Sequence, residues 1–79
     1  MAALRLLSRR YCHLCDDMLA ELSRLRDAQA FELDVVDIDL FPELEARYGD
    51  LVPVLLAGEM ELCHYHFDEQ AVRAYLSRG

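Results

Sequence analysis

The sequence has no lysine and few residues of three other kinds: three glycines, two prolines and three cysteines among its 79 residues. So little glycine and proline, together with 54% hydrophobic residues, excludes a disordered chain and predicts a packed globule. Three cysteines are too few, and odd in number, for the disulfide framework of a small secreted protein. A chain of this length predicts one domain, spanning residues 1–79.

The sequence also lacks the hydrophobic segments that would direct it to a membrane. Its N-terminus has no basic stretch ahead of a long apolar core, so it does not resemble a signal peptide. No apolar run approaches the ~18 residues that cross a bilayer. We therefore expect a cytoplasmic protein without membrane partners. In that compartment, closely spaced cysteines are more often catalytic or metal-binding than structural.

Negative charge dominates the chain, with 15 acidic residues, eight arginines and a net charge of −7. Between Asp27 and Glu69, Arg47 is the single base among twelve acidic residues, a pattern typical of a solvated acidic surface. Such a surface repels the phosphate backbone, so we expect no nucleic-acid partner. Two of the arginines, Arg9 and Arg10, lie just before the first cysteines and predict a local positive patch beside them.

The most informative motif is Cys12-His13-Leu14-Cys15, which follows an apolar run at residues 4–7 and precedes a helical pattern. A strand that leads into a helix in this way puts a sulfur at the positive end of the helix dipole, where the reactive thiolate is stabilised. The second sulfur, one turn further on, can close a disulfide with the first. The motif therefore predicts a reversible two-electron redox switch, although the same spacing also occurs in zinc sites.

Hydrophobic periodicity and turn residues predict seven elements in the order β-α-β-α-β-β-α. The first two strands are joined by a helical crossover and should be parallel, whereas the last two should form an antiparallel hairpin. The stripe Leu14, Met18, Leu22 and Leu25 predicts the buried face of the first helix. The fold class is therefore α/β, with a four-stranded mixed sheet and helices on both faces. The predicted strands are 4–8, 31–38, 52–57 and 60–67, and the helices are 13–27, 41–49 and one that follows an N-cap at Asp68.

Three features together resemble the glutaredoxin-like members of the thioredoxin superfamily. They are the Cys12-His-Leu-Cys15 motif after the first strand, the Val52-Pro53 pair before the third, and the order of the elements. The resemblance covers essentially the whole chain and is closest to the short bacterial glutaredoxin-like proteins. It implies a thioredoxin-like fold and a thiol–disulfide oxidoreductase that transfers electrons through a redox-active disulfide.

The resemblance also implies roles for individual residues. Cys12 corresponds to the nucleophile and Cys15 to the buried resolving cysteine, which converts a mixed disulfide into an intramolecular one. Pro53 corresponds to the family's cis-proline, which lies against the active-site disulfide. That proline leaves the backbone of the preceding residue, Val52, free to pair with a substrate chain.

Four further positions are implied to support the reaction or to bind substrate. Arg9 occupies a position that is usually lysine in glutaredoxins, and Tyr11 fills the slot just before the nucleophile. His13 lies between the thiols, and Asp68 could retain part of the glutathione-binding role. The implied partners are a disulfide-containing protein, or glutathione as a co-substrate. The protein itself is expected to be a monomer that needs no cofactor and no metal.

The sequence departs from typical glutaredoxins near the expected glutathione site. His13-Leu14 replaces the usual Pro-Tyr between the cysteines, and Leu51 replaces the usual threonine before Val-Pro. The usual Gly-Gly is absent from residues 63–70, where the bulk of residues 65–67 could close the groove. These departures affect the recognition of glutathione and leave the dithiol chemistry intact.

The charges around the motif predict how readily Cys12 ionises. The helix dipole, the two preceding arginines and a protonated His13 favour the thiolate, whereas Asp16 and Asp17 oppose it from one turn away. We therefore predict that Cys12 ionises more readily than an ordinary cysteine, without reaching the extreme of the most acidic catalytic thiols. His13 should also make the disulfide more oxidising than an uncharged residue at this position would.

A second group of reactive residues lies in the fourth predicted strand. Cys63 is expected to be a core thiol, with glutathionylation, dimerisation or metal binding as its alternatives. His64 and His66 are two apart on a strand and should face one side, either as a solvated surface or as part of a Cys/His zinc set. Two other functions stay open: a module that binds zinc or an iron–sulfur cluster through Cys12, and a redox-inert adaptor that binds a partner through the Val-Pro surface.

Overall fold

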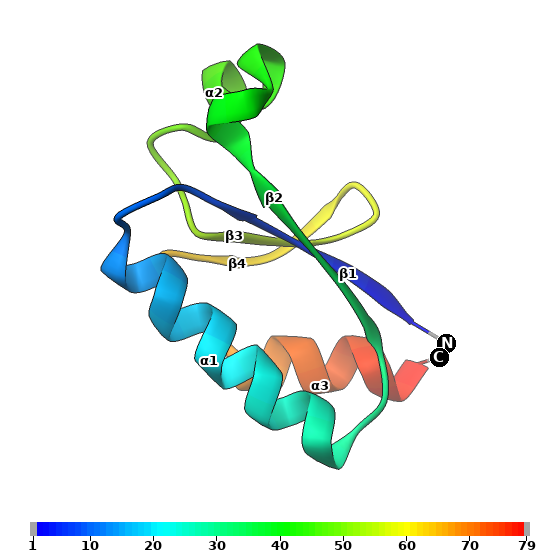
Figure 1. Cartoon of the computed structure of the whole chain (residues 1–79). Coiled ribbons are helices and arrows are strands. Elements are labelled where there is room, and N and C mark those ends of the chain that lie inside the picture. The colour runs from blue at the N-terminus through cyan, green and yellow to red at the C-terminus, as the bar shows by residue number, and fades with distance from the viewer. Residues whose placement is uncertain (1, 79) are drawn as a thin grey trace.

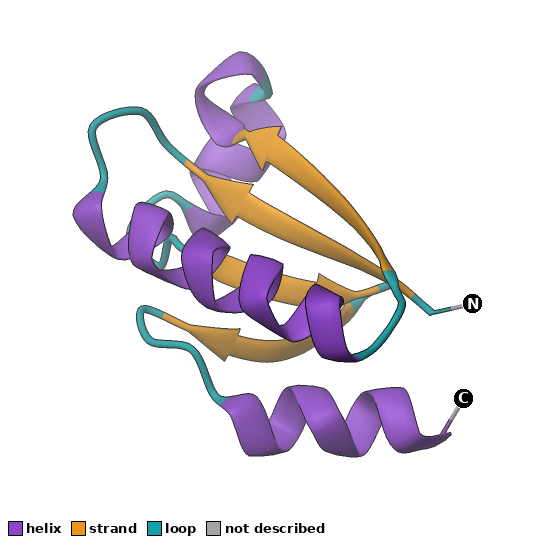
Figure 2. Ribbon diagram, turned by 60° about the horizontal axis from the view of Figure 1, so that its bottom comes forward, coloured by secondary structure: helices purple, strands orange, loops and turns teal. Residues whose placement is uncertain are grey.

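In the computed structural model, which describes residues 2–78, a four-stranded mixed sheet carries helices on both faces (Figure 1 and Figure 2). The order of elements confirms the predicted β-α-β-α-β-β-α arrangement, with a short 3-10 helix added after the second strand. The elements are β1 (Ala3–Ser8), α1 (His13–Ala28), β2 (Glu32–Asp37), η1 (Ile38–Leu40), α2 (Pro42–Tyr48), β3 (Val54–Ala57), β4 (Met60–His64) and α3 (Glu69–Arg78).

The strands lie in the order β2-β1-β3-β4. β1 is parallel to β2, and β3 and β4 form an antiparallel hairpin, both as predicted. β1 is also antiparallel to β3, with Leu7 opposite Val54. These directions bring the ends of β1, β2 and β4 and the start of β3 to one edge of the sheet.

The core consists of two clusters, one on each face of the sheet. α1 and α3 cover one face, and α2 lies on the other, over the edge where β1 ends (Figure 1). Among residues 2–78, no helix combines the length and the hydrophobicity needed to cross a bilayer. The larger cluster, under α1 and α3, includes Leu4, Leu6, Met18, Leu22, Phe31, Leu55 and Val72. The smaller one, on the α2 side, contains Leu7, Ile38, Val54 and Leu56.

Two strand boundaries differ from the prediction by two or more residues, and the other differences are of one residue. β3 begins at Val54 rather than at Val52, because Pro53 has no N–H to donate to a strand ladder. β4 ends at His64 rather than at Phe67, because Tyr65 has a backbone φ of 64° and turns the chain out of the strand. Residues 65–67 therefore form a bend between β4 and α3.

The buried face of α1 also differs from the predicted stripe at the start of the helix, where it begins one residue later. Met18, Leu22 and Leu25 are buried as predicted, but Leu14 is 37% exposed and Cys15 takes its place in the core. The spacing from Cys15 to Met18, Leu22 and Leu25 follows one helical face. The prediction for Leu14 was wrong because both it and Cys15 fit the apolar period, and only packing against the sheet selects one of them.

Candidate active site

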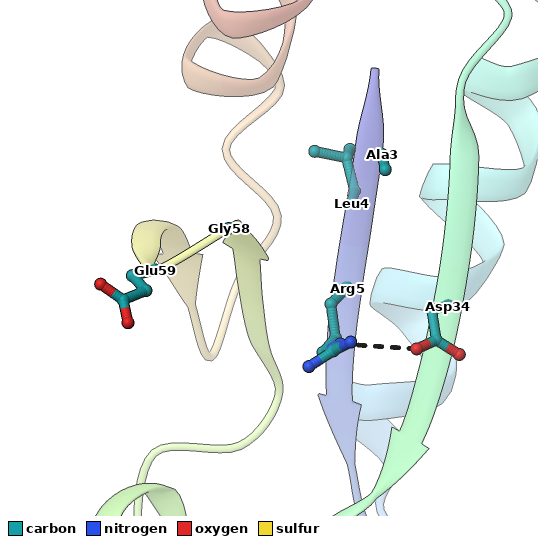
Figure 3. Close-up of a pocket in the computed structure, with 6 residues that line it drawn as sticks. All are labelled: Ala3, Leu4, Arg5, Asp34, Gly58 and Glu59. Carbon is teal, nitrogen blue, oxygen red and sulfur yellow. Dashed lines mark ion pairs between the residues drawn. The ribbon is translucent and has the colours of Figure 1, made fainter. Parts of the chain in front are cut away.

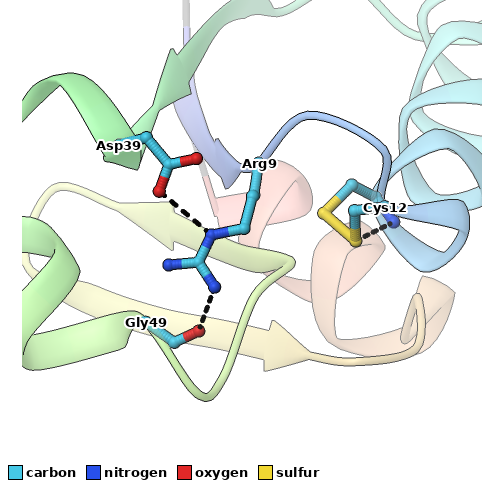
Figure 4. Close-up of a disulfide and its surroundings, with 5 residues drawn as sticks. Arg9, Cys12, Asp39 and Gly49 are labelled. Atoms are coloured by element: carbon cyan, nitrogen blue, oxygen red, sulfur yellow. Dashed lines mark hydrogen bonds and ion pairs between the residues drawn. A yellow bond between two sulfur atoms is a disulfide. The ribbon is translucent and has the colours of Figure 1, made fainter.

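A disulfide joins Cys12 and Cys15 where β1 leads into α1 (Figure 4). Their Cα atoms are 5.2 Å apart, within the usual range for a disulfide. Cys12 is the N-cap of α1, and its Sγ accepts a hydrogen bond of 3.1 Å from the Cys15 backbone N–H. This N–H and the positive end of the helix dipole stabilise negative charge on the Cys12 sulfur when the disulfide is opened.

The two sulfurs differ in their access to solvent. Cys15 is 3% exposed and belongs to the buried face of α1, whereas Cys12 is partly exposed at the helix end. An incoming disulfide can therefore approach Cys12 but not Cys15. This kind of asymmetry suits disulfide exchange with a nucleophilic and a resolving thiol, because access decides which sulfur is attacked.

The loop before β3 lies at the same edge of the sheet as the disulfide. Because Leu7 of β1 pairs with Val54 of β3, the chain beyond β1 and the chain before β3 leave the sheet at neighbouring points. The Val52–Pro53 peptide bond is cis, as the resemblance predicts. Within residues 2–78, the Val52 backbone makes no hydrogen bond to another backbone group, so it is available to an added strand.

Tyr65 ties this loop to the end of β4. Its backbone N–H donates to the Pro53 carbonyl at 2.9 Å, and its hydroxyl donates to the Asp50 carbonyl at 2.8 Å. Its ring lies edge-on to the His64 ring, with centroids 4.7 Å apart. The sequence indicated only that residues 65–67 are bulky. No pattern in it pointed to Tyr65 as a bridge, because the bridge depends on the turn after β4.

Arg9 points away from the disulfide, toward neighbouring elements (Figure 4). Its Nε donates to Asp39 Oδ1 at 3.1 Å, its Nη2 to Glu45 Oε1 at 3.1 Å, and its Nη1 to the Gly49 carbonyl at 3.3 Å. Asp39 lies in η1 and Glu45 in α2, so Arg9 connects the β1–α1 loop to both of these elements.

The predicted positive patch beside the thiols is therefore wrong for Arg9, which is paired with two carboxylates, whereas the Arg10 side chain is 79% exposed. In addition to the pairs of Arg9, Arg10 Nε lies 3.8 Å from Asp37 Oδ2. Asp39 and Glu45 were missed as partners of the site. The sequence did carry a signal that Asp37 and Asp39 lie near Arg9 and Arg10. These residues lie at or just after the ends of two strands predicted to be parallel, β1 and β2, and such ends meet at one edge of a sheet.

The residues next to Cys12 form an exposed and partly apolar surface. Tyr11 is 100% exposed and has a φ of 59°, a conformation that costs a non-glycine residue about 1–2 kcal/mol. His13 is exposed as the first residue of α1, and Leu14 follows it with its side chain partly in solvent. Tyr11 and Leu14, which flank Cys12 in the sequence, thus offer exposed apolar groups near the start of α1.

Asp68 caps α3 and also contacts Cys63. Its Oδ1 accepts a hydrogen bond from the Ala71 N–H at 3.1 Å, which confirms the predicted N-cap. Burial raises the pKa of the Cys63 thiol; a hydrogen bond from the Asp68 backbone opposes this shift, and the carboxylates of Asp68 and Glu61 add to it. Cys63 is accordingly a buried, protonated thiol in the core cluster under α1 and α3.

His64 and His66 do not share a strand face, contrary to the prediction. β4 ends at His64, whose Nδ1 lies 2.9 Å from Glu61 Oε2, and the His66 N–H donates to the His64 carbonyl at 2.7 Å in a tight turn. Side chains two residues apart face one side only within a strand, and the positive φ of Tyr65 ends the strand between them. In the described part of the chain, no three or more His, Cys, Asp or Glu side chains are grouped as metal ligands.

An open hollow of about 400 Å³ lies at the end of the sheet opposite the disulfide (Figure 3). It is formed where β1 begins and where β3 turns into β4, and its lining includes an ion pair of 3.4 Å between Arg5 of β1 and Asp34 of β2. Because β1 begins at the hollow and ends at the loop that carries Cys12, the hollow is separate from the disulfide. The lining residues are Ala3, Leu4, Arg5, Asp34, Gly58 and Glu59.

Comparison of the sequence with known families shows that the family described as Glutaredoxin-like domain (DUF836) matches residues 3–77. The uncharacterized protein Rv0508 of Mycobacterium tuberculosis is 30% identical over 79 aligned residues. This alignment covers 94% of the present chain and 81% of that protein.

Solved structures of similar proteins have the same fold. Protein Ne2328 from Nitrosomonas europaea is 42% identical, with a TM-score of 0.85 over 94% of this chain and 89% of that one. Protein XcR50 from X. campestris is 38% identical, with a TM-score of 0.75 over 96% of this chain and 97% of that one. Thioredoxin 1 from Thermosipho africanus is 19% identical, with a TM-score of 0.64 over 96% of each chain. This last likeness concerns the fold alone and confirms the predicted thioredoxin-like architecture.

Proposed function

This chain belongs to the glutaredoxin-like family that matches its residues 3–77, and from that premise we propose that it is a thiol–disulfide oxidoreductase. In this proposal Cys12 is the nucleophile and Cys15 the resolving residue. The observation that carries it is the asymmetry of the pair: Cys12 is partly exposed at the N-cap of α1, whereas Cys15 is 3% exposed. The family and the vicinal cysteines are compatible with such redox chemistry.

The reaction proceeds from the reduced dithiol in two exchanges. The Cys12 thiolate attacks one sulfur of a substrate disulfide, and the other substrate sulfur leaves as a thiolate that takes up a proton. The Cys15 thiolate then attacks Cys12 Sγ and releases the second substrate sulfur, which is protonated in turn. Two electrons pass to the substrate, and the Cys12–Cys15 disulfide forms. An external thiol reductant returns it to the dithiol.

We propose a disulfide in an extended polypeptide as the substrate, with glutathione as the alternative partner. The free backbone of Val52 can add a substrate strand at the edge that carries Cys12. The exposed side chains of Tyr11 and Leu14 can contact the substrate's apolar groups beside its disulfide. The sulfurs themselves carry the electrons, so the reaction needs no bound cofactor, and a reducing compartment such as the cytoplasm would supply the thiol reductant.

Replacing each cysteine by serine tests the proposal. The reduced wild-type protein should reduce a model polypeptide disulfide, such as that of insulin, and Cys12→Ser should abolish this activity. Cys15→Ser should instead form a stable mixed disulfide at Cys12, because the resolving thiol is missing. Mass spectrometry of the non-reduced adduct identifies the attached group.

The matched control is Cys63→Ser, which removes the third thiol without touching the pair. It should retain reduction of the polypeptide disulfide, and its Cys12 should still form no stable adduct. Full activity of Cys12→Ser would contradict the proposal and favour a redox-inert adaptor. Purification of the reduced protein with stoichiometric zinc or iron would contradict it in favour of a metal-binding module.

A further inference from the structure

We propose that the redox site discriminates against anionic disulfides, such as that of glutathione, and accepts neutral or basic polypeptide disulfides, because Asp39 and Glu45 neutralise Arg9. This inference rests on the proposed function and specifies the substrate class of the same site. Asp39 and Glu45 are specificity-determining residues in this view, although neither reacts with the substrate.

The first argument concerns how firmly Arg9 is held. Its side chain is only 33% exposed, and all three of its guanidinium nitrogens donate hydrogen bonds. The partners are the carboxylates of Asp39 and Glu45 and the Gly49 carbonyl. A planar guanidinium held at three points by groups on two other elements has little freedom to turn toward an anion at Cys12.

Gly49 makes this arrangement possible by its lack of a side chain. A Cβ atom at this position would lie 2.5 Å from the Glu45 carbonyl oxygen and 3.1 Å from its Oε1, the atom that binds Arg9. Its φ of −52° is open to any residue, so close approach rather than backbone conformation accounts for the glycine. The end of α2 therefore leaves room for Glu45 and presents the Gly49 carbonyl to Arg9.

The second argument concerns the other charges near Cys12. Arg10 has its own carboxylate partner in Asp37. Asp16 in the first turn of α1 and Asp17 directly after it are exposed, and the Asp16 N–H donates to the Cys12 carbonyl at 3.1 Å. His13 is the one other basic side chain of the motif. Arg9 and Arg10 are therefore outnumbered by five carboxylates, which are those of Asp16, Asp17, Asp37, Asp39 and Glu45.

These charges produce a negative potential where the substrate disulfide must approach. Glutathione disulfide carries a net negative charge, so it approaches against this potential. A disulfide flanked by basic groups is attracted instead. Such effects act mainly on association, and they weaken as salt screens the charges over a Debye length of about 10 Å at 0.1 M.

The test measures the second-order rate of the reduced protein with three small disulfides at several ionic strengths. The probes are cystamine, which is cationic, 2-hydroxyethyl disulfide, which is neutral, and glutathione disulfide, which is anionic. Added salt should slow the reaction with cystamine, leave the neutral probe nearly unchanged, and speed the reaction with glutathione disulfide. The thiol leaving groups differ in acidity, but the direction of the salt effect reports charge. The same rates measured with dithiothreitol in place of the protein give the salt dependence of a thiolate without the protein's surrounding charges.

The Asp39→Asn/Glu45→Gln double variant tests the residues themselves. The amides keep the shape of the carboxylates but leave the charge of Arg9 uncompensated. At low salt, the rate with glutathione disulfide relative to the neutral probe should rise by about threefold to tenfold. The control is Glu43→Gln/Glu59→Gln, which changes the net charge equally without touching Arg9 and should shift this ratio by less than about twofold. Thermal denaturation checks that both variants fold.

Two results would overturn the inference while leaving the proposed function in place. One is a wild-type reaction that added salt slows with glutathione disulfide or speeds with cystamine, which is the opposite of the expected direction. The other is an equal change of the probe ratio in the double variant and its control, which would assign the effect to net charge alone. If the reduced protein attacks none of the three disulfides, the proposed function itself fails and the inference with it.

Discussion

Cys12 and Cys15 are identical side chains three positions apart, and the helix start between them gives them different properties. Cys12 precedes the first helical residue, so its sulfur caps the helix and keeps contact with solvent. Cys15 is one turn further and falls on the face that Met18 and Leu22 bury against the sheet. A cysteine pair with one accessible and one buried member thus follows from the placement of a single helix terminus.

Cys63 shows how burial alone changes a thiol. Because the folded state raises the pKa of Cys63 above its ordinary value of 9.0, the unfolded chain loses this proton at a lower pH than the folded protein does. The contribution of Cys63 to stability is therefore fully present below about pH 9 and is lost as the pH rises toward the folded value. We expect the Cys63→Ala variant to lose less of its free energy of unfolding between pH 8 and pH 10 than the wild type loses.

Urea unfolding at a series of pH values measures this difference. The cavity left by alanine lowers stability at every pH, so the slope against pH, and not the absolute stability, reports the thiol. All other ionisable groups are common to both proteins, so their contributions cancel in the comparison. Parallel pH profiles for the two proteins would show that the ionisation of Cys63 is not coupled to folding.

At the scale of elements, the site is assembled where three connections meet at one edge of the sheet. The β1–α1 loop carries Cys12, the loop before β3 carries Pro53, and the bend after β4 carries Tyr65. Tyr65 is the link between the last two, through its hydrogen bonds to the Asp50 and Pro53 carbonyls. The loop that offers the Val52 backbone is thus positioned by a residue that follows the other strand of the hairpin, β4.

We predict that Tyr65→Phe loosens this loop, because it removes the hydrogen bond to Asp50 and keeps the ring. Loss of one partly exposed hydrogen bond of about 0.5–1 kcal/mol should raise KM for a polypeptide disulfide about two- to fivefold. The rate at which Cys12 reacts with iodoacetamide should stay unchanged, because no part of the dithiol is altered. Steady-state kinetics and an alkylation time course provide the two measurements.

Tyr75→Phe on α3 is the matched control, since it removes the same atom from a helix away from the loop. It should leave both KM and the alkylation rate at the wild-type values. An unchanged KM in Tyr65→Phe would mean that the Asp50 contact does not position the substrate loop. Slower alkylation in that variant would mean that its effect reaches the nucleophile.

At the scale of the whole molecule, most of the core lies between the sheet and the two helices α1 and α3. Leu22 is fully buried in this larger cluster. A protein of this length has roughly 4–12 kcal/mol of total stability, and Leu→Ala at a fully buried site costs about 2–5 kcal/mol. We therefore expect Leu22→Ala to lose a large share of the free energy of unfolding in a urea titration.

Leu40→Ala removes the same atoms from a side chain that is 70% exposed and serves as the comparison. Its free energy of unfolding should stay within about 0.5 kcal/mol of the wild-type value. Losses of similar size in the two variants would show that burial under α1 does not dominate the stability of the fold.

Much of the fold could be predicted from local patterns. The apolar period of α1, the β-branched run of β2 and the Asp68 cap of α3 each depend on neighbours within a few residues. The exact end of β4 and the exposure of Leu14 could not be predicted in this way. The first depends on the left-handed turn at Tyr65, and the second on which of two adjacent apolar residues faces the sheet.

The sequence alone determined the cysteine pair on which the proposed chemistry rests, because a C-x-x-C motif at the start of an amphipathic helix needs no distant residue to be recognised. Only the tertiary structure decided its surroundings. Arg9 is 30 residues from Asp39 and 36 from Glu45 in the chain, and it meets both where the parallel strands end. Local sequence predicts a free cation beside Cys12, whereas the folded chain neutralises it, because pairing between charges is set by distance in space and not along the chain.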